Sequence, residues 1–194
     1  KGWEVGLHAS WYAYSNAKEM KRQKEQVERV IDARVESVRH HNLHFDVRHT
    51  PRVQEAAGFR ADSSLGFNDN VGFRFGTCYP WSLRDVVSGT DLGVLEIPLI
   101  IQDKCLVDAL GCGSEELALE WAQRIIERVK AVGGVLTLLW HPGYLGSPLY
   151  VNVYRRILGL LYAQNACFAT MRRIVEMWPA PRKGAENTEM SVRS

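Results

Sequence analysis

The chain has 194 residues, of which 46% are hydrophobic and 24% are charged, which is close to an ordinary soluble protein and enough to bury one core. The formal net charge is only +2 and the basic residues are scattered among acidic ones, so the charge balance does not indicate a nucleic-acid partner. No run of about 18 apolar residues occurs, so no membrane span is expected.

The predicted elements alternate between strands and helices. In chain order we expect a strand at 3–10, a helix at 17–31, a strand at 35–39, a short helix at 50–58, a strand at 59–65, a long loop with local hairpin character at 66–90, a strand at 94–101, a helix at 114–133, a strand at 135–140, a helix at 150–165, a strand at 167–170 and a helix at 171–178. This alternation predicts an α/β fold with parallel strands, either a barrel or a doubly wound sheet.

The first strand begins almost at Lys1, and no signal peptide is visible. A chain end seldom enters a buried element at once, so we expect residues 1–180 to form a domain that is incomplete at its N-terminus. Residues 181–194 are polar and poor in apolar side chains, which predicts a disordered tail.

The four cysteines, Cys78, Cys105, Cys112 and Cys167, form no C-x-x-C pair and have no histidine at zinc-finger spacing. Free thiols in a reducing compartment are the simpler interpretation, which favours the cytoplasm without defining the compartment. Cys105 and Cys112 could bridge in an exported protein. The glycines around Cys112 do not directly follow a strand and lack the third glycine of a nucleotide fingerprint.

Polar side chains gather where the predicted strands end. They are His8 at the C-terminal end of the first strand, Arg39, His40 and His41 at the end of the second, Asp62, Ser63 and Ser64 near the end of the third, and His141 at the end of the strand at 135–140. In parallel α/β folds these ends share one face, and that face carries the site. Imidazoles are metal ligands and general acids or bases, and a guanidinium can hold a carboxylate, so a hydrolase-type site is expected.

Four segments, in this order, resemble the polysaccharide deacetylase family of carbohydrate esterases. Residues 2–10 (GWEVGLHAS) resemble its segment GHEIGLHGS, residues 37–46 (SVRHHNLHFD) resemble GVRQHYLRFD, residues 57–66 (AGFRADSSLG) resemble AGFEYDSTLG, and residues 138–142 (LLWHP) resemble its closing strand with a histidine. The resemblance covers residues 1 to about 178. No single motif is decisive, but the order and spacing of all four agree.

The resemblance implies a partial, distorted (β/α) barrel without its first strand or strands. It implies hydrolysis of N- or O-acetyl groups on sugars by a divalent metal, usually zinc, held by one Asp and two His. His8 then corresponds to a metal ligand, Arg39 to the residue that orients the catalytic Asp, and His141 to the general acid. Such a metal polarises the acetyl carbonyl and activates water.

Two departures from the family pattern matter. The Asp-Asp motif belongs upstream of His8, on a strand that this chain does not contain. The second metal histidine is usually four residues after the first, where this chain has Tyr12. His41 is the candidate replacement ligand, although a substrate contact is the alternative. His40 and His44 are expected to be loop or surface residues, and a structural role is expected for His49.

Candidate substrate contacts are Asp62, Trp81, Tyr79 and Trp140, with Phe75 as a further aromatic side chain. For Asp62 the alternative is that it satisfies backbone groups at a strand end. For the aromatic side chains the alternative is core packing, and Trp140 is expected to pack beside the site.

The predicted function is a metal-dependent hydrolase of acetyl amide or ester bonds on a polysaccharide or N-acetylated sugar. The main alternative, favoured by Tyr12 and the missing Asp motif, is a carbohydrate-binding or scaffold relative without catalysis. A metal-dependent hydrolase of another bond, such as a phosphoester, is a third interpretation. The sequence does not indicate an oligomeric state.

Overall fold

The computed structural model describes residues 2–178, so the tail predicted at 181–194 lies outside the described residues. The strands are β1 (Leu7–Ala9), β2 (Ser37–His40), β3 (Ala61–Asp62), β4 (Trp81–Asp85), β5 (Thr90–Glu96), β6 (Ile101–Gln102) and β7 (Leu138–Leu139). The helices are α1 (Ala17–Ile31), α2 (Thr50–Ala56), α3 (Glu115–Val132), α4 (Pro148–Ala163) and α5 (Met171–Met177). Short 3-10 turns η1 (Trp11–Ser15), η2 (His41–Leu43) and η4 (Pro142–Gly146) follow β1, β2 and β7, and a π-helical segment η3 (Cys105–Leu110) follows β6.

Five strands form one sheet in the order β1-β2-β3-β5-β4, and β6 and β7 form a separate pair. β1, β2, β3 and β5 are parallel, β6 and β7 are also parallel, and β4 is antiparallel to β5. The predicted α/β class with parallel strands is therefore confirmed. The sheet does not close on itself, since β1 ends one sheet and β7 pairs only with β6 among the described strands.

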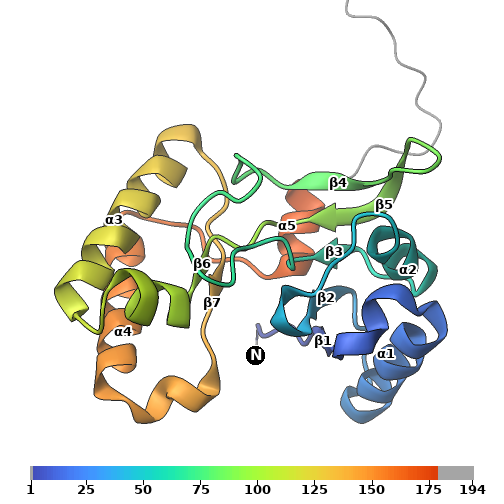
Figure 1. Ribbon diagram of the computed structural model, residues 1–194, viewed down its shortest axis with the longest axis horizontal. Helices are drawn as coiled ribbons and strands as arrows, with labels where there is room; N and C mark the ends of the chain where they lie inside the picture. The colour runs from blue at the N-terminus through green and yellow to red at the C-terminus, as the bar shows by residue number, and fades with distance from the viewer. Residues whose placement is uncertain (1, 179–194) are drawn as a thin grey trace, which may run out of the picture.

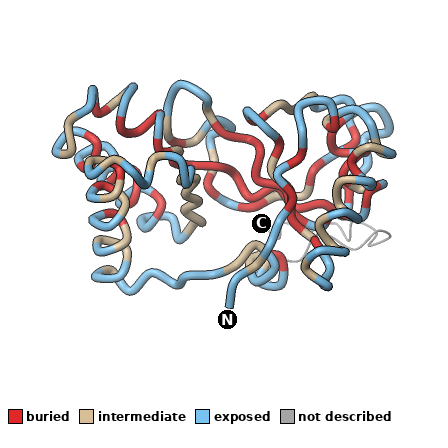
Figure 2. The backbone as a smooth tube through the Cα atoms, turned by 90° about the horizontal axis from the view of Figure 1, so that it is seen from below, coloured by how far each residue is buried: buried red, intermediate tan, exposed pale blue. Residues whose placement is uncertain are grey.

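The helices cover the strands from two sides (Figure 1). Met20 of α1 and Val53 of α2 pack with Leu7 and Val38 of the neighbouring strands β1 and β2. On the other side, α3 and α4 pack with the π-helical segment in the largest core cluster. Figure 2 shows that burial follows the strands and the segments just after them, while the outer faces of the helices are exposed.

Local sequence explains where the helices α1 and α3 begin and where α3 ends. The Asn16 side chain accepts a hydrogen bond from the Glu19 backbone N–H (3.1 Å) at the start of α1, and Ser114 accepts one from Leu117 (3.3 Å) at the start of α3. Gly133 ends α3 at φ 66°, a left-handed conformation that favours glycine. These helices agree with the predicted ones.

The hairpin character expected in the loop at 66–90 is present, because this segment contains β4, which pairs with β5 as a hairpin. Two other elements differ from the prediction. The apolar run expected as one strand at 94–101 divides around Pro98 into the end of β5 and the start of β6, and the Thr137 hydroxyl donates to the Pro98 carbonyl there. No strand forms at 167–170, because Thr170 is instead the N-cap of α5 and accepts from Arg173 (3.2 Å).

All four cysteines are free; Cys78 and Cys105 are buried, and Cys112 and Cys167 are exposed. The alternative of a bridge between Cys105 and Cys112 is therefore not realised. Among residues 2–178, none of the helices has the length and apolar character needed to cross a membrane.

Candidate functional site

The strand ends of β1, β2 and β7 converge on one open cavity of about 1200 Å³. His8, Arg39 and His141 all line it, together with apolar side chains from β7 and the helices beyond. The edges of β1 and β7 that pair with no other described strand both border this cavity. The convergence expected from the order of strands is therefore present, and it brings these candidate residues to one place.

His41 does not line the cavity, but its ring lies next to that of His8, which does. The His8 Nε2 and His41 Nδ1 atoms are 3.3 Å apart, and the two rings meet edge to face with centroids 5.4 Å apart. Burial, and secondly the His41 ring, lower the pKa of His8 below its ordinary value, against a backbone hydrogen bond at Arg39 that raises it. A lowered pKa favours the neutral imidazole, which is the form that binds metals.

The spacing of the two nitrogens fits a shared metal. Two nitrogens bound to zinc at about 2.0–2.1 Å in a tetrahedron lie roughly 3.3 Å apart. The same distance also suits an N–H···N hydrogen bond. Within residues 2–178 no group of three or more His, Cys, Asp or Glu side chains is gathered for an ion, so a metal bound between His8 and His41 would need a further donor.

His41 reaches this position because of the turn that follows β2. Asn42 and Leu43 have φ values of 52° and 53°, which reverse the backbone directly after His41. Tyr12, which stands where the family pattern has its second metal histidine, is 78% exposed.

Arg39 is fixed at the cavity wall by Ser63. Its Nε donates to the Ser63 carbonyl (2.7 Å) and its Nη2 donates to the Ser63 hydroxyl (2.8 Å). Burial lowers the pKa of Arg39, while the negative charges of Asp62 and Glu96 oppose that shift. The guanidinium is thereby held in one orientation, with acidic groups next to it as counter-charges.

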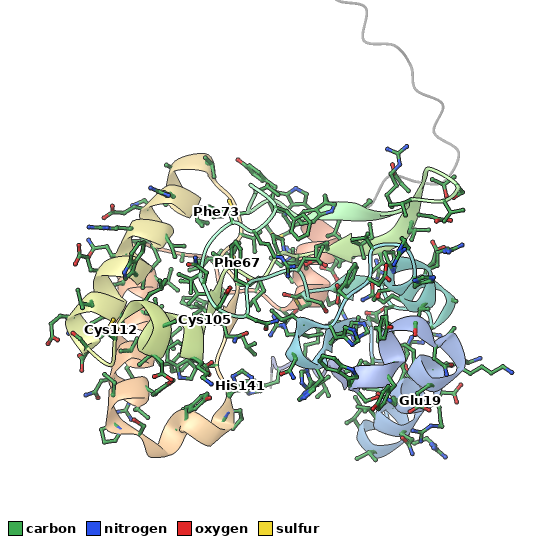
Figure 3. All side chains as sticks on the ribbon, viewed as in Figure 1. Glu19, Phe67, Phe73, Cys105, Cys112 and His141 are labelled. Carbon is green, nitrogen blue, oxygen red and sulfur yellow. The ribbon has the colours of Figure 1, made fainter. Side chains whose placement is uncertain are left out.

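Asp103 orients His141. The buried Asp103 carboxylate, directly after β6, accepts from the His141 backbone N–H (2.5 Å) and lies 3.0 Å from His141 Nδ1 through each of its oxygens. Because Nδ1 is engaged, Nε2 is the ring atom free to act on a substrate. Figure 3 shows His141 between the helices α3 and α4 on one side and the β1 end of the sheet on the other.

Sequence reasoning did not include Asp103, although the signal was available. The residue directly follows β6, just as His41 directly follows β2. A single strand predicted at 94–101 does not indicate a strand end at Gln102.

The four candidate substrate contacts do not lie together. Trp140 lines the cavity and packs on Tyr154, with centroids 5.2 Å apart. Trp81 packs beside Phe75 in a separate cluster, and the Tyr79 hydroxyl donates to the Val132 carbonyl. Neither Trp81 nor Tyr79 lines this cavity.

Asp62, the fourth candidate, is fully buried and does not line the cavity. Its carboxylate accepts from the Ser64 hydroxyl (2.6 Å), which in turn accepts from the His40 backbone N–H (2.9 Å). This arrangement favours the alternative in which Asp62 organises backbone and side-chain polar groups at the strand end.

The remaining histidines have other surroundings. His40, expected in a loop or at the surface, is instead fully buried on β2. His44 is stacked between Trp11 and Tyr14, with ring centroids 4.0 Å from each. His49 pairs with Asp46 on the surface at 3.2 Å.

Comparison with known proteins gives a likeness of fold. No protein-family model matches the sequence, and no curated protein matches it. Among solved structures, the chain is similar to one described as "putative polysaccharide deacetylase from Mycobacterium smegmatis", with a TM-score of 0.64 and 23% sequence identity. The match covers 83% of this chain and 55% of that one, so the chain spans about half the length of this neighbour. The mixed α/β fold therefore agrees with the family that the sequence motifs resemble.

Proposed function

We propose that the protein is a metal-dependent deacetylase that removes acetyl groups from a polysaccharide or an N-acetylated sugar. The observation that carries this proposal is that His8, Arg39 and His141 line one cavity, with His41 next to His8 (3.3 Å) and Asp103 next to His141 (3.0 Å). The fold likeness to the mycobacterial protein supports it.

In this proposal His8 and His41 would hold the divalent ion, and their two imidazole donors suit zinc. When bound, zinc supplies Lewis acidity at the acetyl carbonyl and acidifies a water molecule. His141 protonates the leaving amine or alcohol through Nε2, since Asp103 holds Nδ1. Arg39 orients a carboxylate or the substrate at the cavity wall.

A third metal ligand and a catalytic base are still required by this chemistry. Glu4 also lines the cavity, but its carboxylate already accepts from the Ser37 hydroxyl (2.8 Å) and from the Arg172 backbone N–H (2.8 Å). We propose that the chain forms part of a (β/α) barrel in which a further strand, bearing carboxylates, pairs with the free edges of β1 and β7. Those edges border the cavity, and unpaired strand edges readily accept another strand.

The test is zinc-dependent release of acetate from chitin oligosaccharides by a protein that contains this chain together with the carboxylate-bearing strand. His141→Ala is expected to lower the rate about 10²- to 10⁴-fold, the range for loss of a general acid, while the surface control His49→Ala leaves it unchanged. A metal-replete protein that releases no acetate, or a His141→Ala variant as active as the parent, would contradict the proposal.

A carbohydrate-binding relative without catalysis is the second candidate. Its support is that the described residues gather only two metal ligands, with Tyr12 in place of the usual histidine. Binding of the same oligosaccharides without zinc and without acetate release would favour it.

A further inference from the structure

Two acidic side chains, Asp62 and Glu96, meet behind Arg39 with no solvent access. Asp62 ends β3, Glu96 ends β5, and the two are register partners in this parallel pair. Both residues are 0% exposed. Because register partners on neighbouring strands project to the same face of a sheet, the two carboxyl groups lie on one side.

The hydrogen bonds of the two groups leave one oxygen on each without a donor. Asp62 Oδ1 accepts from the Ser64 hydroxyl (2.6 Å), and Glu96 Oε1 accepts from the Leu65 backbone N–H (3.0 Å). Asp62 Oδ2 and Glu96 Oε2 are both buried without a partner among the described residues. Buried acceptors are nearly always satisfied, and one proton placed between these two oxygens satisfies both.

The charges around the pair favour a single proton. Arg39 on β2 is the cation whose charge acts on both carboxyl groups. His40, also on β2, is fully buried, and burial lowers its pKa, so it adds no cation at neutral pH. On β4 the register partner of Glu96 is Trp81, which carries no charge. Two ionised carboxylates would leave an uncompensated buried charge, whereas one carboxylate balances Arg39.

We propose that Asp62 and Glu96 share one proton in the folded protein, with Glu96 as the neutral donor to the Asp62 carboxylate, and that this pair is the counter-charge that holds Arg39 at the cavity wall. The proton sharing does not depend on the proposed enzymatic function. In agreement with it, burial, and then the charge and hydrogen bond of Asp62, raise the pKa of Glu96 well above its ordinary value.

The proposal has a defined consequence for stability. A glutamate whose pKa is raised on folding stabilises the folded state fully below its unfolded pKa, about 4.3. That contribution is lost as the pH rises toward the folded pKa. In this window the unfolding equilibrium constant of the parent rises by up to about tenfold per pH unit, relative to a variant that lacks the group.

The direct experiment follows the side-chain carboxyl carbons of ¹³C-labelled Glu by NMR between pH 4 and pH 9. We expect one glutamate carboxyl to remain protonated at pH 7 in the parent, and its signal to be absent in Glu96→Gln. In Asp62→Asn the same signal is expected to titrate at lower pH, because the neighbouring charge is gone. Glu36→Gln, which removes a partly exposed glutamate paired with Arg60 and Arg172, is the matched control and should keep the signal.

Urea unfolding provides the second readout. The unfolding free energy of the parent, relative to that of Glu96→Gln, should fall as the pH rises from 5 to 9, whereas relative to that of Glu36→Gln it should not follow that trend. A parent in which every glutamate is ionised at pH 7 would overturn the proposal. So would a Glu96 signal that titrates unchanged in Asp62→Asn. The NMR measurement on the parent remains decisive even if a variant does not fold.

Discussion

Replacing Asp103 with alanine removes the group that anchors the end of β7 to the end of β6. Its carboxylate accepts from the backbone N–H groups of His141 (2.5 Å) and Lys104 (2.6 Å), and it lies 3.0 Å from His141 Nδ1. A backbone donor left without a partner costs about 1–3 kcal/mol. Water can reach part of the exposed His141, so we expect a total loss of about 2–4 kcal/mol of unfolding free energy.

Asp103→Asn removes the negative charge but keeps the size of the side chain. The amide retains one acceptor oxygen but places an NH₂ group against donors, so the free energy of unfolding of Asp103→Asn should lie between that of the parent and that of Asp103→Ala. Urea unfolding followed by tryptophan fluorescence measures both variants. If the proposed function holds, Asp103→Asn should also lower kcat for acetate release more than it changes KM, because Asp103 positions His141 without touching the substrate. An Asp103→Ala variant within about 0.5 kcal/mol of the parent, the range of ordinary surface substitutions, would refute this reasoning.

Three further substitutions test the fold by urea unfolding. Met20→Ala should cost about 2–5 kcal/mol, because Met20 is fully buried between α1 and the sheet; a loss under about 1 kcal/mol would contradict that packing. Gly66→Ala should cost about 1–3 kcal/mol, since a Cβ there would lie 2.7 Å from the Leu99 Cβ and 2.9 Å from its carbonyl oxygen, and a neutral result would count against this close approach. Asn16→Ala should cost about 1 kcal/mol by removing the cap that binds the Glu19 N–H, with Asn16→Asp expected to retain most of that stability.

The sequence was sufficient to place His8, Arg39, His41 and His141 together. Each lies at or just after the end of a predicted parallel strand, and such strands bring their carboxyl ends to one face of the fold. Predicting this convergence requires only the order and direction of the strands, and the alternation of strands and helices along the sequence indicates both. The helices α1 and α3 were also predictable, because their caps and apolar spacing are local features.

Other features depend on contacts that a linear pattern does not contain. Asp103 was missed because Pro98 divides one apolar run into two strands of different sheets. Asp62 was considered for substrate contact, but its burial depends on the register between β3 and β5. The strand β4 is five residues long within a glycine-rich segment, and its pairing with β5 decides its conformation.

The central claim is that His8 and His41 together form part of a metal centre. Equilibrium dialysis against zinc, with the metal content of the retained protein measured afterwards, tests it most directly. We predict zinc binding at a stoichiometry of one per chain, lost in His8→Ala and in His41→Ala and retained in His49→Ala. A protein that retains no zinc, or His8→Ala and His41→Ala variants that retain as much as His49→Ala, would contradict the account.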